Sequence, residues 1–83
     1  MPPKVKIYTL STCSHCRNAK KFLNENDIPY EATEVDMLEG AARAAVIEEV
    51  KKINPRCTFP TIAVEDQVVV GFNEQELRKA LSL

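Results

Sequence analysis

Two cysteines separated by two residues, in Cys13-Ser14-His15-Cys16, are the side chains best suited to chemistry in this sequence. A β-favouring segment precedes them and a helical pattern follows, so Cys13 is expected at the N-terminus of a helix. Free amide groups and the helix dipole favour a thiolate there. Cys16 falls one turn later on the same side, a spacing that brings two Cα atoms within the roughly 4.4–6.8 Å that a disulfide needs. The pair therefore predicts thiol–disulfide exchange, in which an exposed, acidic sulfur attacks and a more buried sulfur resolves the product.

Inert core cysteines and a structural zinc site are the alternatives to a redox pair. Zinc takes four ligands in such sites, and Cys13, Cys16, Cys57 and His15 would supply suitable atoms. Around a helix axis, however, His15 lies about 100° from Cys16 and about 200° from Cys13, so the four side chains should not converge. His15 is expected to face solvent or a partner, either as an ordinary exposed histidine or as one that modulates the thiolate.

A second segment that could take part in the chemistry is Thr58-Phe59-Pro60. It precedes a predicted strand, and a proline at the start of a strand marks an edge or a turn because it has no amide donor. If the peptide bond before Pro60 is cis, the backbone of Phe59 can face the cysteine pair. Those backbone groups could then pair with an extended substrate segment, as an added β-strand does.

The spacing of apolar residues predicts the elements that position both segments. The expected strands cover residues 4–10, 30–37, 61–64 and 68–70, and the expected helices cover 16–26, 40–53 and a final segment capped by Asn73, with Glu76 three residues later. The order β-α-β-α-β-β-α places two parallel strands before an antiparallel hairpin and provides helices for both faces. We therefore expect an α/β fold with a four-stranded mixed sheet, which resembles the thioredoxin fold in its smallest form.

Length and composition limit what the chain can be. Its 83 residues allow a single domain, residues 1–83, and 45% hydrophobic with 28% charged residues is the balance of a globular protein. A net charge of −1 argues against a nucleic-acid-binding protein. No apolar run approaches the roughly 20 residues that span a bilayer, and Met1-Pro2-Pro3-Lys4 lacks the apolar stretch of a signal peptide. We expect a cytoplasmic monomer, with no nucleic-acid or membrane partner, in a compartment that keeps thiols reduced.

Together these residues resemble the glutaredoxin and NrdH-redoxin branch of the thioredoxin superfamily. The matching stretches are Ile7-Tyr8-Thr9, Cys13-Ser14-His15-Cys16, Arg56-Cys57-Thr58-Phe59-Pro60 and Val70-Gly71-Phe72. The resemblance implies that Cys13 is the nucleophile, Cys16 the resolving cysteine and Pro60 a cis-proline beside them. It further implies a substrate-binding surface made of Ser14, His15, Arg56, Thr58, Phe59, Pro60, Gly71, Phe72 and Asn73. Disulfide-containing proteins such as a ribonucleotide reductase would be the substrates.

Departures from the family pattern concern the electron donor, which is either glutathione or a dedicated disulfide reductase. Typical glutaredoxins often carry a lysine where this chain has Leu10, and a Gly-Gly pair before an acidic residue where it has Gly71-Phe72-Asn73. That Gly-Phe pair is more similar to NrdH-type redoxins, which a flavin reductase reduces. Arg56 matches a basic position near the glutathione site, and Asn73 or Glu74 could still contact a ligand.

Two further alternatives stay open at the level of sequence. Some glutaredoxins with serine after the first cysteine resemble this chain and hold a [2Fe–2S] cluster between two subunits, with glutathione supplying further thiolates; otherwise no cofactor is expected. Cys57, three residues before Pro60, is either a small half-buried residue or a third thiol open to oxidation. On the second predicted helix, Glu48 and Glu49 are expected to be solvated charges.

Overall fold

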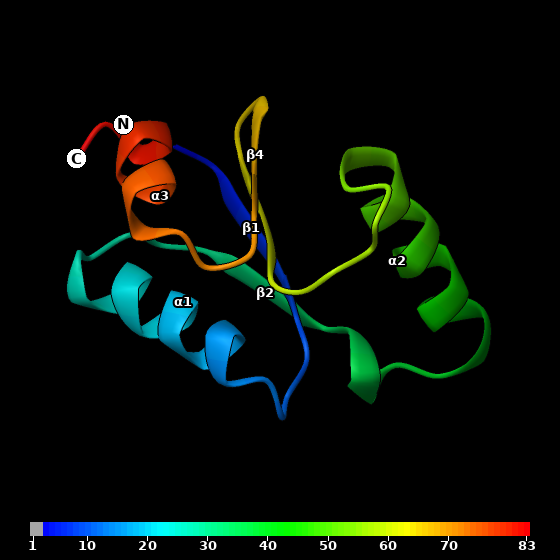
Figure 1. The fold of residues 1–83 in the computed structure, drawn as a ribbon. Helices are drawn as coiled ribbons and strands as arrows, with labels where there is room; N and C mark the ends of the chain where they lie inside the picture. The colour runs from blue at the N-terminus through cyan, green and yellow to red at the C-terminus, as the bar shows by residue number, and fades with distance from the viewer. Residues whose placement is uncertain (1–2) are drawn as a thin grey trace.

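A computed structural model describes residues 3–83 and shows a sheet between two layers of helices (Figure 1). Met1 and Pro2, part of the segment expected to lack a signal peptide, lie outside the described residues. The elements are β1 (Val5–Thr9), α1 (Ser14–Glu25), β2 (Glu31–Glu34), η1 (Val35–Met37), α2 (Gly40–Ile53), β3 (Thr61–Val64), β4 (Gln67–Val70) and α3 (Glu74–Leu81). The strand order is β2-β1-β3-β4, with β1 parallel to β2 and antiparallel to β3. The predicted α/β class and the four-stranded mixed sheet are confirmed.

Helices α1 and α3 cover one face of the sheet, and α2 lies on the other face (Figure 1). The core on the α1 and α3 side is aliphatic apart from one phenylalanine: Val5, Ile7, Ala19, Phe22, Leu23, Ile62, Val64, Val69, Leu77 and Leu81. A smaller cluster, formed by Tyr8, Val35 and Val50, attaches the second layer. The alternation of side chains along β1 accounts for both layers, since Val5 and Ile7 point to one face and Tyr8 points to the other. No helix within residues 3–83 is long and apolar enough to cross a membrane.

Helix α1 begins at Ser14, two residues before the predicted start, because Cys13 itself is the N-cap with an extended backbone. The helix ends where Asp27 adopts the left-handed conformation at φ 55°. There the N–H of Asp27 donates to Asn24 O at 3.1 Å and the N–H of Ile28 donates to Leu23 O at 2.9 Å. This pair of hydrogen bonds satisfies carbonyls that a helix end would otherwise leave free.

Strand β2 is shorter than predicted, since the chain leaves the sheet after Glu34 and forms the short helix η1. The polar–apolar alternation continues past Glu34, so the sequence pattern could not show this change of path. Val35 turns into the smaller cluster, where it is 2% exposed. Asp36 meanwhile accepts hydrogen bonds from Ser11, in the loop after β1.

Tyr8 links the sheet to α2 through a charged partner. Its hydroxyl donates to Glu49 Oε1 at 2.5 Å, and Lys6 Nζ lies 4.0 Å from the same oxygen. Glu49 is exposed, as expected of a solvated charge, but it is also the hydrogen-bond acceptor for Tyr8. Helical spacing could not reveal this, because Glu49 and Tyr8 are 41 residues apart.

We expect Tyr8→Phe to lower the free energy of unfolding by about 1 kcal/mol at neutral pH, because it removes this hydrogen bond. Burial, and then the hydrogen bond to Glu49, raise the pKa of Tyr8 from 10.0 to about 12. The folded state thus holds the proton more tightly than the unfolded state. The contribution of this Tyr8 proton to stability is complete below pH 10 and disappears as the pH rises toward about 12.

Denaturant unfolding of both proteins at pH about 7 and about 11 measures this difference. The stability gap between the wild type and Tyr8→Phe should narrow at the higher pH. Tyr30→Phe, at the other tyrosine of the chain, is the matched control. A gap that stays constant, or is equal for both substitutions, would contradict the assigned role of Tyr8.

Candidate active site

Cys13 lies at the N-terminus of α1, as the predicted order of strand and helix indicates. Its N–H donates to Leu10 O at 3.1 Å, which closes a tight loop after β1, and its carbonyl accepts from Arg17 N at 3.1 Å. The side chain is half-exposed. The backbone N–H of Cys16 lowers the pKa of the Cys13 thiol against the opposing effect of burial, and the Cys16 thiol, the N–H of His15 and the charge of Arg17 also lower it. Cys13 therefore has the accessibility and the acidity of an attacking thiolate.

Cys16 has the opposite environment. It is 1% exposed, and Leu10 donates its N–H to Cys16 Sγ at 3.4 Å. Burial is the main cause that raises the pKa of Cys16 to about 11, and the neighbouring Cys13 and the charge of Glu34 add to it. At neutral pH the site thus holds one acidic sulfur at the surface and one protonated sulfur behind it.

The loop that carries Cys13 is fastened to η1. Asp36 accepts from Ser11 N at 2.9 Å and from Ser11 Oγ at 2.5 Å. The Ser11 hydroxyl, together with its backbone N–H, lowers the pKa of Asp36. The sequence interpretation missed this contact, because the alternation past Glu34 concealed the end of β2. Since β1 and β2 are parallel, their carboxyl ends meet at the same edge of the sheet, which brings Asp36 next to Ser11.

The loop before β3 is ordered by a buried side chain that the sequence interpretation treated only as the end of a helix. Asn54 is 3% exposed, and its Nδ2 donates to Thr58 O at 3.2 Å, to Thr58 Oγ1 at 3.1 Å and to Thr61 Oγ1 at 3.0 Å. Cys57 donates its N–H to Asn54 O at 2.8 Å and has a left-handed backbone at φ 50°. The Phe59–Pro60 peptide bond is cis, as the family resemblance implies.

The two predicted chemical segments meet on one apolar cluster. Leu10, from the cysteine loop, and Cys57 and Phe59, from the proline loop, all pack against the smaller cluster of Tyr8, Val35 and Val50. Pro60 is itself buried. The shared cluster holds the loops that carry Cys13 and Pro60 in a fixed relation to each other.

Gly71, Phe72 and Asn73 make different contacts. Gly71, at φ 77°, donates its N–H to Pro60 O at 2.7 Å and so lies directly beside the proline loop. Phe72 instead packs into the core, with its ring centroid 6.0 Å from that of Phe22. Asn73 caps α3 by accepting from Glu76 N at 3.1 Å, as its spacing predicts. Only Gly71 of these three is placed next to Pro60.

The remaining candidate residues for substrate binding are solvent-exposed: Ser14, His15, Arg56 and Thr58. Among residues 3–83, no three His, Cys, Asp or Glu side chains gather in a way that could hold a metal ion. The single-chain zinc set considered above therefore does not assemble.

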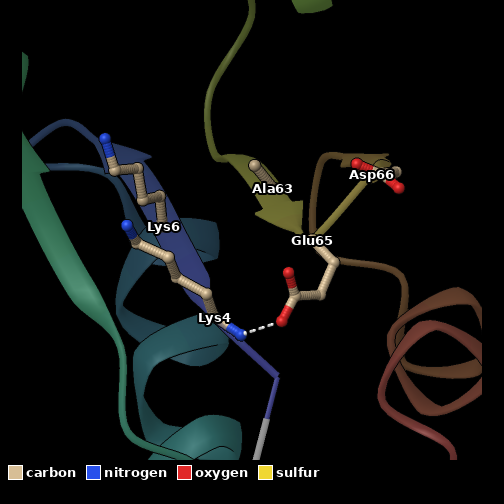
Figure 2. A pocket seen from close by; sticks show the side chains of 5 residues that line it. All are labelled: Lys4, Lys6, Ala63, Glu65 and Asp66. Carbon is tan, nitrogen blue, oxygen red and sulfur yellow. Dashed lines mark hydrogen bonds between the residues drawn. The ribbon is translucent and has the colours of Figure 1, made fainter.

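A shallow pocket of about 220 Å³ lies away from the cysteines, near the start of β1 (Figure 2). Its lining includes Lys4, Lys6, Glu65 and Asp66. Figure 2 shows the Glu65 carboxylate turned toward the backbone N–H of Lys4, which donates to it at 2.7 Å. Because Cys13 follows the opposite end of β1, this pocket is not part of the cysteine site.

Comparison with known proteins agrees with this geometry. The glutaredoxin family model matches residues 5–69. Glutaredoxin 1 of Rickettsia bellii is 34% identical over 70 residues, covering 82% of this chain and 68% of that protein. The glutaredoxin-like protein NrdH of Lactococcus lactis is 28% identical over 75 residues, covering 90% of this chain and 96% of that protein.

Among solved structures, the methanoredoxin of Methanosarcina acetivorans superposes with a TM-score of 0.93 at 35% identity. The match covers 99% of this chain and 87% of that one. The family model covers residues 5–69, and the structural match covers 99% of this chain. The site has the same character, since a cysteine with a lowered pKa precedes a buried one. The chain therefore belongs to the glutaredoxin family.

Proposed function

We propose that this protein is a dithiol–disulfide oxidoreductase that reduces protein or low-molecular-weight disulfides with Cys13 and Cys16. The difference in environment between the two sulfurs is the observation that carries the proposal. Hydrogen bonds to Cys13 favour its thiolate, whereas burial keeps Cys16 protonated. Glutaredoxin-family membership supports the same reaction class.

The reaction transfers two electrons from the cysteine pair to the substrate. The Cys13 thiolate attacks one sulfur of a substrate disulfide, and the other sulfur leaves as a thiolate that takes up a proton. Cys16 then loses its proton and attacks Cys13 Sγ, which releases the second substrate thiolate. The substrate ends as two thiols and the protein as a Cys13–Cys16 disulfide.

Backbone groups near Pro60 suggest how a protein substrate would be held. In the described part of the chain, neither the N–H nor the carbonyl of Phe59 has a hydrogen-bond partner. A substrate segment in extended conformation could pair with these groups, as a strand adds to a sheet edge. Exposed Arg56 and Thr58 precede Phe59 and would contribute to the same surface.

A direct test mixes the reduced protein with a disulfide-containing protein, such as insulin, and follows the appearance of substrate thiols. The expected product on the enzyme is a Cys13–Cys16 disulfide, which peptide mapping identifies, with Cys57 still open to alkylation after unfolding. Substrate reduction that leaves the two cysteines as thiols would overturn the proposal.

We expect glutathione to be a poor electron donor for this protein. Leu10 stands where typical glutaredoxins often have a lysine for the glutathione carboxylate, and its side chain packs into the smaller cluster. Phe72 likewise packs toward Phe22 in the core. Both positions are therefore occupied by apolar side chains with internal partners.

The donor test offers the oxidised protein three reducing systems and measures reduction of the Cys13–Cys16 disulfide. These are glutathione with its reductase, a flavoprotein of the thioredoxin-reductase type and an iron–sulfur disulfide reductase. We expect one of the dedicated reductases to be the faster donor, and Leu10→Lys to increase the rate with glutathione. Fast reduction of the wild type at physiological glutathione concentrations would contradict this assignment.

The wider biological setting is also part of the proposal. Similarity to the NrdH protein supports a ribonucleotide reductase as one candidate protein substrate. We propose a cytoplasmic monomer. The alternative function is a [2Fe–2S] cluster held between two subunits, with glutathione supplying further thiolates. Visible absorbance after anaerobic purification distinguishes the two functions.

A further inference from the structure

An ion pair joins α1, one turn after the resolving cysteine, to the end of β2. Lys20 follows Cys16 by one helical turn, so both side chains lie on the same face of α1. Its Nζ contacts Glu34 Oε1 at the end of β2. Thr9, level with Glu34 in the parallel pairing, donates its hydroxyl to Glu34 Oε2 at 2.8 Å. The same segment of the chain also contacts Cys16, because Leu10, the residue after Thr9, donates its N–H to Cys16 Sγ.

This pair is more shielded from water than the other ion pairs of the described chain. The side chains of Lys20 and Glu34 are 25% and 31% exposed, whereas those of Lys51 and Glu48 on α2 are 53% and 72% exposed. Charges shielded from water act more strongly on a neighbouring ionisable group than exposed charges do. Lys20 in turn lowers the pKa of Glu34, which keeps the carboxylate charged at neutral pH.

We propose that this ion pair controls the resolving step: the Glu34 carboxylate slows the attack of Cys16 on a mixed disulfide, and the Lys20 ammonium limits that slowing. Glu34 and Lys20 are positioning residues here, since they act through Cys16 and not on the substrate. The inference rests on the proposed dithiol function. It concerns the second half of the reaction only.

The mechanism follows from the charge that develops on Cys16. To attack, Cys16 must become a thiolate, which a nearby carboxylate disfavours and a nearby ammonium favours. The charge of Glu34 contributes to the raised pKa of Cys16. Cys13 is the other ionisable group that acts on Cys16, and Asp36 is a second carboxylate that acts on Glu34. Neither Glu34 nor Lys20 is among the causes that lower the pKa of Cys13.

Opposite effects are therefore expected from the two ends of the pair. Glu34→Gln removes the negative charge but keeps an oxygen for Thr9 and Lys20, and should accelerate resolution by about threefold to tenfold. Lys20→Met leaves Glu34 unneutralised and should slow resolution by a similar factor. The double variant should return close to the wild-type rate. A purely structural role would instead shift both single variants in the same direction, because each weakens the same ion pair.

The experiment mixes reduced protein with one equivalent of dithiobis(nitrobenzoate), whose leaving thiolate is coloured. Attack by Cys13 releases the first nitrothiolate in a second-order phase. Attack by Cys16 on the mixed disulfide releases the second nitrothiolate in a first-order phase, which measures resolution directly. All proteins carry Cys57→Ser, so that the third thiol does not react. Glu48→Gln and Lys51→Met, in the exposed pair on α2, are the matched controls and should change neither phase.

The two phases separate this inference from the proposed function. If the first phase is slow, or if no Cys13–Cys16 disulfide forms, the dithiol function itself fails. If both phases occur and the second has equal rates in wild type, Glu34→Gln and Lys20→Met, only the control by the ion pair is refuted. Lys20→Arg, which keeps the charge, should retain the wild-type rate. Circular dichroism confirms that each variant is folded, and a same-direction shift in both variants also overturns the proposal.

Discussion

Cys13→Ser is expected to reduce disulfide reductase activity to background, the largest single effect foreseen for this chain. The substitution removes a half-exposed sulfur whose pKa is lowered by its neighbours. Cys16 cannot take over the attack, because it is 1% exposed and its pKa is raised to about 11. A serine oxygen at the same position has no comparable nucleophilicity at neutral pH. The loss is measured as the rate at which the reduced protein reduces a protein disulfide.

Alkylation supplies an independent measurement of the same assignment. At pH about 6 the wild type should react with iodoacetamide at Cys13, because hydrogen bonds from its neighbours lower the pKa of that thiol. Cys13→Ser should lose this reaction, whereas Cys16→Ser should retain it. Cys57→Ser is the control for loss of a cysteine outside the pair and should leave turnover unchanged. Equal loss of alkylation in the Cys13 and Cys16 variants would contradict the two roles.

Local pattern predicts most of the fold. The spacing of Ala19, Phe22 and Leu23 predicts α1, and the β-branched run Val68-Val69-Val70 predicts the last strand, because their periodicities of burial are short-range properties of the sequence. The order of elements then leaves few topologies for so small a sheet. The position of Cys13 at a helix mouth follows from this order alone.

Contacts between distant segments could not be predicted in the same way. Asn54 orders the proline loop through Thr58 and Thr61, but its sequence neighbourhood shows only a helix end before a proline. The link between Ser11 and Asp36 depends on where β2 ends, and alternation beyond Glu34 concealed that end. Pattern therefore gives the positions of the reactive sulfurs, whereas the side chains that orient their loops emerge only once the strands are paired.

The second large effect concerns Cys16→Ser, which we expect to accumulate a mixed disulfide between Cys13 and a protein substrate. Without Cys16, no internal thiol is available at the site to release the substrate. Cys57 is the remaining thiol of such a variant, but its side chain packs against the smaller cluster of Tyr8, Val35 and Val50. Non-reducing electrophoresis after mixing with a disulfide-containing protein should show an adduct that dithiothreitol dissolves, and the wild type should show none. Cys57→Ser combined with Cys16→Ser should accumulate the same adduct.

The raised pKa of Cys16 explains why this cysteine attacks only after Cys13 has formed the mixed disulfide. In the reduced protein, the hydrogen bond and the charge of Cys13 both help to raise the pKa of Cys16. When Cys13 enters a mixed disulfide its negative charge disappears, so the pKa of Cys16 should fall just when its thiolate is needed. Proximity also accelerates the step, because the attack of Cys16 on Cys13, one helical turn away, is intramolecular. The rate at which the wild type resolves the adduct should therefore rise with pH from neutrality to about pH 9. The midpoint of this rise should lie below the pKa of Cys16 in the reduced protein. A midpoint at about 11, or an adduct of Cys16→Ser that resolves as fast as that of the wild type, would contradict this mechanism.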